Sequence, residues 1–280
     1  MANNFSLEPL SQISKKIIED KGVWNDKCPV SLERLRLLKF SYYDFNDSEH
    51  HNGEIIILDV VADYVANIFK ELHALKFPID KARTIEKYNG NDEESMADNN
   101  SSSFHCREIT GGLPSIHSYG LAIDINPLQN PYIAESDISN KKPNQGLLKI
   151  LPAEGYNYLN RTNIRPGMVE PIVTIFTRNG FSIWGGKWNN PIDWQHFQPS
   201  RAMAQLLASM SYDDRYTFFN LYVKESKLLN SIDPKENKFV ALYQQNPNLF
   251  IQCFKDLPNL LTMDPQQAYE LLSSKLRTPK

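Results

Sequence analysis

The pattern of hydrophobic and polar positions predicts a helix near the N-terminus, followed by a hairpin. Apolar residues recur at helical spacing from Leu7 to Ile18, and Gly22 is placed to end that helix. Two β-prone apolar runs follow, 35–43 and 54–58, with a stretch of turn-forming residues between them. Strand, turn and strand in this order predict a β-hairpin.

A second helix is predicted over 59–76, where Asp59 would cap its start and Pro78 would stop it. Segments 82–88 and 121–125 have the pattern of strands. Segment 89–103 between them is dense in Asn, Asp and Ser, which is typical of a solvated loop.

The rest of the chain is first irregular and then helical. Segment 126–165 is broken by four prolines, and a connection of that length is usually functional or wraps the core. A helix is predicted over 169–178, with Gly180 as its C-terminal cap, and strand–turn–strand over 181–188. After residue 200 helical spacing returns and continues into a last helix that Asp264-Pro265 would start.

Composition and charge limit the function classes. An apolar fraction of 41% is enough for a packed core, so disorder of the whole chain is excluded. A formal charge of −3 from 30 basic and 33 acidic residues does not indicate a nucleic-acid partner. No apolar run is long enough for a transmembrane segment. Residues 1–6 carry no basic and then apolar leader, so we expect either a cytoplasmic protein or a leader outside this chain.

The three cysteines exclude a zinc site built from four thiolates. Cys28 and Cys106 could form a disulfide in an oxidising compartment and leave Cys253 free, or all three could be buried thiols. The sequence leaves both alternatives open.

One carboxylate lies inside the predicted strand after Gly120. In an extended chain Ala122 and Asp124 point to one face, and the aliphatic residues around them point to the other. Gly120 permits a close turn that would return His117 to the face of Asp124. A buried carboxylate between two isoleucines needs a positive partner, which a zinc ion would supply.

A second group of polar residues follows a Trp-Gly-Gly sequence. Asp193 precedes His196 by three residues and would place a base beside a third ligand. Two imidazoles and one carboxylate are a set that leaves the fourth position of zinc for water. Asp193 could accept a proton from that water and pass it to the leaving amine. Positions 193 and 196 of a regular strand face opposite sides, so this hypothesis requires a bend.

Each of these residues also has a structural interpretation. His196 beside Phe197 could be a core histidine, and the tryptophans nearby could be core side chains. Four further histidines are interpreted as structural or solvated, because they lie in a predicted turn or lack a paired carboxylate motif: His50, His51, His73 and His105.

Taken together, Ser-x-His-x-x-Gly-x-Ala-x-Asp and the later Asp-x-x-His resemble the signature of the zinc D-alanyl-D-alanine carboxypeptidase family. That family includes D,D-carboxypeptidases, D,D-dipeptidases and L-alanyl-D-glutamate endopeptidases. The likeness spans about Cys28 to Gln198. Further segments resemble one bacterial branch: Gly53 and the following strand, Phe77-Pro78-Ile79, Ser95 to Asn100, Phe104 to Arg107, Asn126-Pro127, Asn130-Pro131-Tyr132, Arg165 to Met168 and the Trp-Gly-Gly run.

The resemblance implies roles for particular residues. The zinc ligands would be His117, Asp124 and His196. Asp193 would be the general base, where many relatives have Glu. An arginine would stabilise the oxyanion, with Arg107 as first choice and Arg83 as second. Ser115 would bind near the substrate or orient the first ligand.

The implied fold is the small α+β domain shared with hedgehog-type domains, in which an antiparallel sheet forms the metal cleft. We expect an N-terminal helical segment (1–27), a peptidase domain (28–200) and a C-terminal helical extension (201–280). The expected activity is zinc-dependent hydrolysis of amide bonds in peptidoglycan stem peptides, in the periplasm or outside the cell. One alternative is a non-catalytic, zinc-containing, cell-wall-binding module of the same fold. A protein partner for the C-terminal helices is a further expectation.

Overall fold

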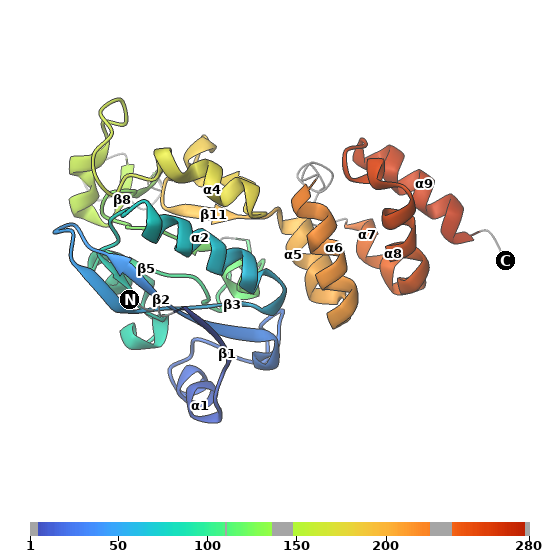
Figure 1. Cartoon of the computed structure of the whole chain (residues 1–280), viewed down its shortest axis with the longest axis horizontal. Coiled ribbons are helices and arrows are strands. Elements are labelled where there is room, and N and C mark those ends of the chain that lie inside the picture. The colour runs from blue at the N-terminus through green and yellow to red at the C-terminus, as the bar shows by residue number, and fades with distance from the viewer. Residues whose placement is uncertain (1–4, 110, 136–147, 225–236, 278–280) are drawn as a thin grey trace.

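The chain combines helices with small, mainly antiparallel sheets. The computed structural model describes residues 5–109, 111–135, 148–224 and 237–277. Along the long axis of the molecule, which is horizontal in Figure 1, the sheets and the helices that precede α5 in the sequence form one end, and helices α5 to α9 form the other. The mixed α and β character expected from the sequence is confirmed.

The first sheet is antiparallel, in the order β1 (Ser6–Pro9), β2 (Leu35–Tyr43), β3 (Glu49–Leu58). This confirms the predicted hairpin, although β3 begins earlier than expected. The turn is short because Asp44 Oδ1 accepts hydrogen bonds from the backbone N–H of Asn46 and Ser48. Helix α2 (Ala62–Ala74) packs on this sheet, with the Phe69 and Phe40 ring centroids 4.1 Å apart.

The N-terminal helix is shorter than predicted. Helix α1 covers only Gln12–Asp20, and the residues before it pair with β2 as a strand. Two features explain the difference: Pro9 would interrupt a helix, and Ser11 caps α1 by accepting from the Ser14 N–H. Gly22 follows the helix with a positive φ of 68°, as expected of a helix stop.

The middle of the chain differs most from its prediction. The strand expected over 82–88 is only β4 (Lys81–Ala82), and a 3-10 helix occupies Ile85–Tyr88. The polar segment after it is no plain loop, because Asn91 caps a helix, α3 (Asp92–Ala97). Strand β5 (Asn100–Ser101) then pairs in parallel with β4.

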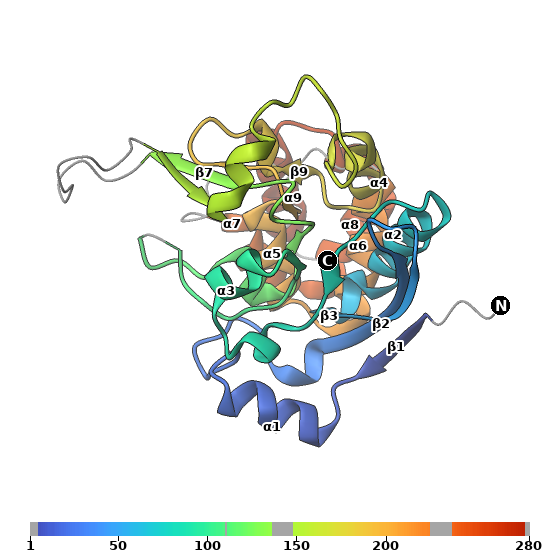
Figure 2. The same ribbon diagram turned by 90° about the vertical axis from the view of Figure 1, so that its left-hand side faces the viewer.

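Two three-stranded antiparallel sheets follow. One has the order β6 (Ile123–Asp124), β11 (His196–Gln198), β9 (Ile183–Trp184), and the other the order β10 (Ile192–Asp193), β7 (Tyr132–Glu135), β8 (Leu148–Leu151). Helix α3 lies next to β8, and Figure 2 shows α3 and β7 on the side of the molecule away from β1 to β3. The helix predicted over 169–178 is a 3-10 turn followed by α4 (Val173–Arg178).

The C-terminal helices are α5 (Arg201–Ser209), α6 (Tyr212–Lys224), α7 (Lys238–Gln245), α8 (Pro247–Asp256) and α9 (Pro265–Arg277). Helix α5 packs on the 3-10 helix Ile116–Tyr119, and one buried apolar cluster runs from the sheets into α5 and α6. The division at residue 200 stays a prediction. Within the described residues no helix is both long and apolar enough to cross a membrane.

The cysteines adopt the first of the two arrangements that the sequence left open. Cys28 and Cys106 form a disulfide with their Cα atoms 5.7 Å apart, and Cys253 is buried and free. The disulfide ties the segment after α1 to the residue before Arg107.

Candidate metal centre

Two imidazoles and one carboxylate meet where a 3-10 helix approaches β6 and β11. Asp124 and His196 are directly opposite each other in the antiparallel register, so their side chains share a face. His117 comes from the 3-10 helix just before β6. Gly120 ends this helix at a φ of 65°, and a Cβ there would lie 2.7 Å from the Leu58 nitrogen. Only glycine therefore allows the close turn that brings His117 to Asp124, as the sequence predicted.

The three side chains have the spacing of ligands around one small ion. His117 Nε2 lies 3.2 Å from His196 Nδ1 and 3.2 Å from Asp124 Oδ2, and His196 Nδ1 lies 2.9 Å from Asp124 Oδ1. Ligand atoms about 2.0–2.1 Å from a tetrahedral zinc ion are about 3.3 Å from one another. The observed separations are close to that value.

The outer nitrogen of each imidazole fixes which nitrogen faces the cluster. His117 Nδ1 donates to the Ser103 carbonyl oxygen, and His196 Nε2 donates to Gln198 Oε1 at 2.7 Å. In the neutral rings, the nitrogens that face Asp124 then carry lone pairs rather than protons. Three acceptors therefore converge on one point, and such a donor set fits a zinc ion.

Burial and mutual attraction shift the pKa values of this cluster. Without a metal, burial favours the neutral form of Asp124, but the charge and hydrogen bonds that His117 and His196 supply when their facing nitrogens carry protons outweigh it and hold the pKa of Asp124 well below its usual range. Burial also lowers the pKa of His196, and its hydrogen bond to Asp124 and the charge of that carboxylate raise it to about 8. Asp124 is therefore a carboxylate at neutral pH, as a metal ligand must be.

Asp193 lies beside the cluster on a different strand from His196. Trp194 and Gln195 form the turn between β10 and β11, which is the bend that the sequence hypothesis required. A Cβ at Gly185 would lie 2.4 Å from the Asp193 carbonyl oxygen, so this glycine allows the strand to sit where it does. Within the described residues Asp193 Oδ1 is buried and has no hydrogen-bond partner. Burial raises the pKa of Asp193 to about 7, against the opposing charge of His196.

The two arginines have different surroundings. Arg107 pairs through Nε with Asp92, and its charge is one of those that lower the pKa of Asp193. Arg83 has a side chain that is 51% exposed and lies 3.9 Å from an Asp98 oxygen. Arg107 is therefore electrostatically connected to Asp193, beside the metal cluster, and Arg83 belongs to a separate charged group.

Ser115 contacts the first histidine through the backbone. Its hydroxyl caps the 3-10 helix by accepting from the His117 N–H at 3.3 Å, and its own N–H donates to the Arg107 carbonyl at 2.8 Å. This geometry orients His117 and links it to the segment that carries Arg107.

Several contacts at the site were missed by the sequence reasoning. Gln198 could have been noticed, because a residue two positions after His196 in a strand points to the same face. Ser103 acts through its carbonyl group, which leaves no side-chain signal. Trp188 is one of the tryptophans interpreted as core side chains, and its ring centroid lies 5.5 Å from that of His196.

Three of the four histidines interpreted as structural pair with carboxylates. The contacts are His50 Nε2–Asp44 at 2.9 Å, His73 Nε2–Glu49 at 2.8 Å and His105 Nδ1–Asp92 at 2.7 Å. His50 and His51 lie within β3 rather than in a turn. The sequence did not indicate these pairs because their partners are distant along the chain or on other elements.

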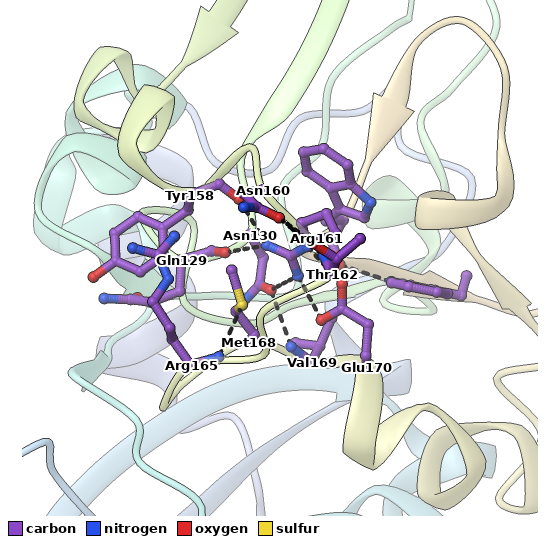
Figure 3. A network of polar contacts seen from close by, with 12 residues as sticks. Gln129, Asn130, Tyr158, Asn160, Arg161, Thr162, Arg165, Met168, Val169 and Glu170 are labelled. Carbon is purple, nitrogen blue, oxygen red and sulfur yellow. Dashed lines mark hydrogen bonds and ion pairs between the residues drawn. The ribbon is translucent and has the colours of Figure 1, made fainter.

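A polar network holds the long segment after Asp124. Figure 3 shows Arg161 at its centre: the guanidinium donates to the Gln129 carbonyl at 2.6 Å, to Asn130 Oδ1 at 2.9 Å and to both Glu170 oxygens. Its carbon Cζ also lies 4.7 Å from the centre of the Trp194 ring. The network thus connects the irregular segment to the turn between Asp193 and His196.

Comparison with known proteins supports one family. Residues 109–199 match the model of a family described as D-alanyl-D-alanine carboxypeptidase. This match covers about a third of the chain and includes the histidine and aspartate cluster, but Arg107 and Arg83 lie before it. No curated protein and no solved structure gave a significant match.

Proposed function

We propose that the chain, whose residues 109–199 match the D-alanyl-D-alanine carboxypeptidase family model, is a zinc-dependent peptidase of peptidoglycan stem peptides. The observation that carries this proposal is the converging donor set of His117, Asp124 and His196. In this proposal these three residues hold zinc, within the hedgehog-like α+β fold that the family implies.

A bound zinc ion would lower the pKa of a water molecule and polarise the scissile carbonyl group. Asp193 is proposed to accept the proton of the attacking water and to deliver it to the leaving amine. A carboxylate with a pKa raised to about 7 can both take and return a proton near neutral pH, which supports this role. Arg107 is proposed to stabilise the negative charge on the carbonyl oxygen.

Substituting the proposed base separates the peptidase from the alternative, a cell-wall-binding module. We expect Asp193→Asn to retain zinc and to lower kcat on purified muropeptides by about 10²–10⁴-fold, the usual contribution of a general base. Asp20→Asn, in the exposed face of α1, is the matched control and should behave as wild type. A wild-type protein that binds zinc and muropeptides without releasing any product would favour the binding module instead.

The disulfide supports a location outside the cytoplasm. Disulfides persist in the periplasm and in secreted proteins and are rare in the reducing cytosol. We therefore propose that the protein acts in the periplasm or at the cell exterior. The three-part domain division, and a protein partner for the helices of 201–280, are proposed on sequence grounds alone.

A further inference from the structure

A second carboxylate, outside the metal cluster, holds the proposed oxyanion arginine. Asp92 is the first residue of α3, and one of its oxygens lies against Arg107 Nε. Its other oxygen lies 2.7 Å from His105 Nδ1. The His105 side chain is 11% exposed, and those of Asp92 and Arg107 are partly exposed, at 29% and 39%.

The backbone around Arg107 is fixed independently of Asp92. The Arg107 N–H donates to the Ser118 hydroxyl at 2.9 Å, and that hydroxyl donates to the Arg107 carbonyl at 2.7 Å. The preceding residue, Cys106, is bonded to Cys28. Ser118 is the neighbour of His117, so the main chain of Arg107 is held at the metal cluster. What the main chain leaves free is the direction of a long, flexible side chain.

Asp92 contacts that side chain. The closest contact between the two is at Arg107 Nε, the nitrogen nearest the main chain. The two terminal amino groups of an arginine are the fork that binds carboxylates and oxyanions. Helix α3 also contacts the turn beside the proposed base, since Gln195 Nε2 lies 3.6 Å from Met96 Sδ. One short helix therefore contacts both the arginine and the strand turn that follows Asp193.

We propose that Asp92 is a positioning residue for catalysis, which holds Arg107 with its terminal amino groups turned toward the anionic oxygen that develops on the substrate. The inference rests on the proposed function, because it assigns Asp92 a task only if Arg107 acts on that oxygen. The group that Arg107 binds is accordingly an oxyanion of an amide or a carboxylate of a peptide, and not a cation.

A structural role alone gives a different expectation. An ion pair between partly exposed side chains contributes little to stability, so an ordinary Asp92–Arg107 pair could be removed without effect on turnover. A positioning role predicts that substituting Asp92 lowers kcat, and that it does so only while Arg107 is present.

The test is a double-mutant cycle on the full chain, with zinc content, kcat and KM measured on muropeptides. We expect Arg107→Ala to lower kcat by about 10²–10³-fold, as for removal of an oxyanion donor. Asp92→Asn should lower kcat about 10-fold or more, with KM and zinc content close to wild type, and Asp92→Glu should restore part of the loss. In the Arg107→Ala background, Asp92→Asn should have no further effect beyond about 2-fold.

Controls separate the neighbouring groups. Glu93→Gln, the adjacent position on α3 whose side chain pairs with Lys149 at 3.0 Å, should keep kcat within about 2-fold of wild type. His105→Gln tests the second partner of Asp92. The proposal is overturned if the kcat of Asp92→Asn equals that of wild type, or if Asp92→Asn lowers kcat by the same factor in the wild-type and Arg107→Ala backgrounds. It is also overturned if the Asp92→Asn variant loses zinc, or if His105→Gln lowers kcat as much as Asp92→Asn does. An unchanged kcat for Arg107→Ala would remove Arg107 from the proposed function and overturn the positioning role of Asp92 with it, while leaving the zinc peptidase itself in place.

Discussion

Asp59 is the centre of a buried charge cluster that joins the sheets to the C-terminal helices. Its side chain is 3% exposed and lies between Arg215 on α6 and Arg34, the last residue of the 3-10 helix before β2. Arg215 Nε donates to Asp59 Oδ1 at 3.1 Å, and Arg34 NH2 lies 3.9 Å from the same oxygen. Arg34 also donates to the Ala208 and Leu207 carbonyls at the end of α5. We predict that Asp59→Asn destabilises the whole protein.

The magnitude follows from the burial of all three groups. Breaking a buried ion pair by removing one partner costs about 3–5 kcal/mol, because the remaining charge stays buried without compensation. Here two guanidinium groups would be left: burial and the charge of Arg215 already lower the pKa of Arg34 to about 10, and Asp59 opposes both. For a protein of this size, about 3–5 kcal/mol corresponds to a fall in Tm of about 6–20 °C. Asparagine keeps the acceptor that Asp59 Oδ1 offers to the Val60 N–H. It removes the charge and also replaces Oδ2, which accepts from Arg215, by an amide group that donates.

The assay is thermal unfolding followed by circular dichroism and calorimetry. Asp47→Asn is the matched control, because it removes an exposed ion pair with Lys76. Asp47 has a φ of 59°, and asparagine tolerates this backbone conformation. Its Tm should equal that of wild type. Since the buried apolar cluster is continuous into α6, we expect one transition. A Tm for Asp59→Asn within about 2 °C of wild type would refute the reasoning, and two separate transitions would show that the helices fold on their own.

Three further predictions concern the disulfide, the metal and the turn before Asp124. Cys28→Ser should lower the free energy of unfolding measured with urea by about 2–5 kcal/mol, because the disulfide to Cys106 closes a loop with a sequence separation of 78 residues. Wild-type protein with this disulfide reduced should unfold at the same urea concentration as the variant. A zinc chelator should abolish turnover and lower Tm, both restored by added zinc, and an activity indifferent to chelation would contradict a metal peptidase. Gly120→Ala should weaken zinc binding at least about 10-fold by displacing His117. Alanine disfavours the positive φ of this position, and its Cβ would clash with the Leu58 backbone. An unchanged zinc affinity in a competition titration would contradict this prediction.

Local pattern predicted the elements that lie on a large apolar face. The hairpin of β2 and β3 was readable from two β-prone apolar runs separated by turn-forming residues. Helix α2 was readable because its buried residues recur every three or four positions. The short elements at the site were less readable. Strands of two residues such as β5 and β10 are too short for a period, and they are ordered by tertiary contacts, as in the parallel pairing of β5 with β4.

The candidate site was predictable only in part. His117, Asp124 and His196 could be selected because their motif spacing resembles a known family, and the structure brings them together. Asp92 had no such signal: it lies in a polar stretch interpreted as a loop, and its value depends on a distant partner, Arg107. Pairings between distant segments are set by the fold and leave no local pattern.

The central claim about this protein is that the cluster of His117, Asp124 and His196 binds zinc and that the protein cleaves peptides. The decisive measurement is metal content by elemental analysis together with product release from purified muropeptides by mass spectrometry, for wild type and His117→Ala. We predict about one zinc ion per chain and a released D-alanine or peptide for wild type, and loss of both for the variant. A folded wild-type protein without zinc, or a His117→Ala variant that still cleaves, would contradict the account.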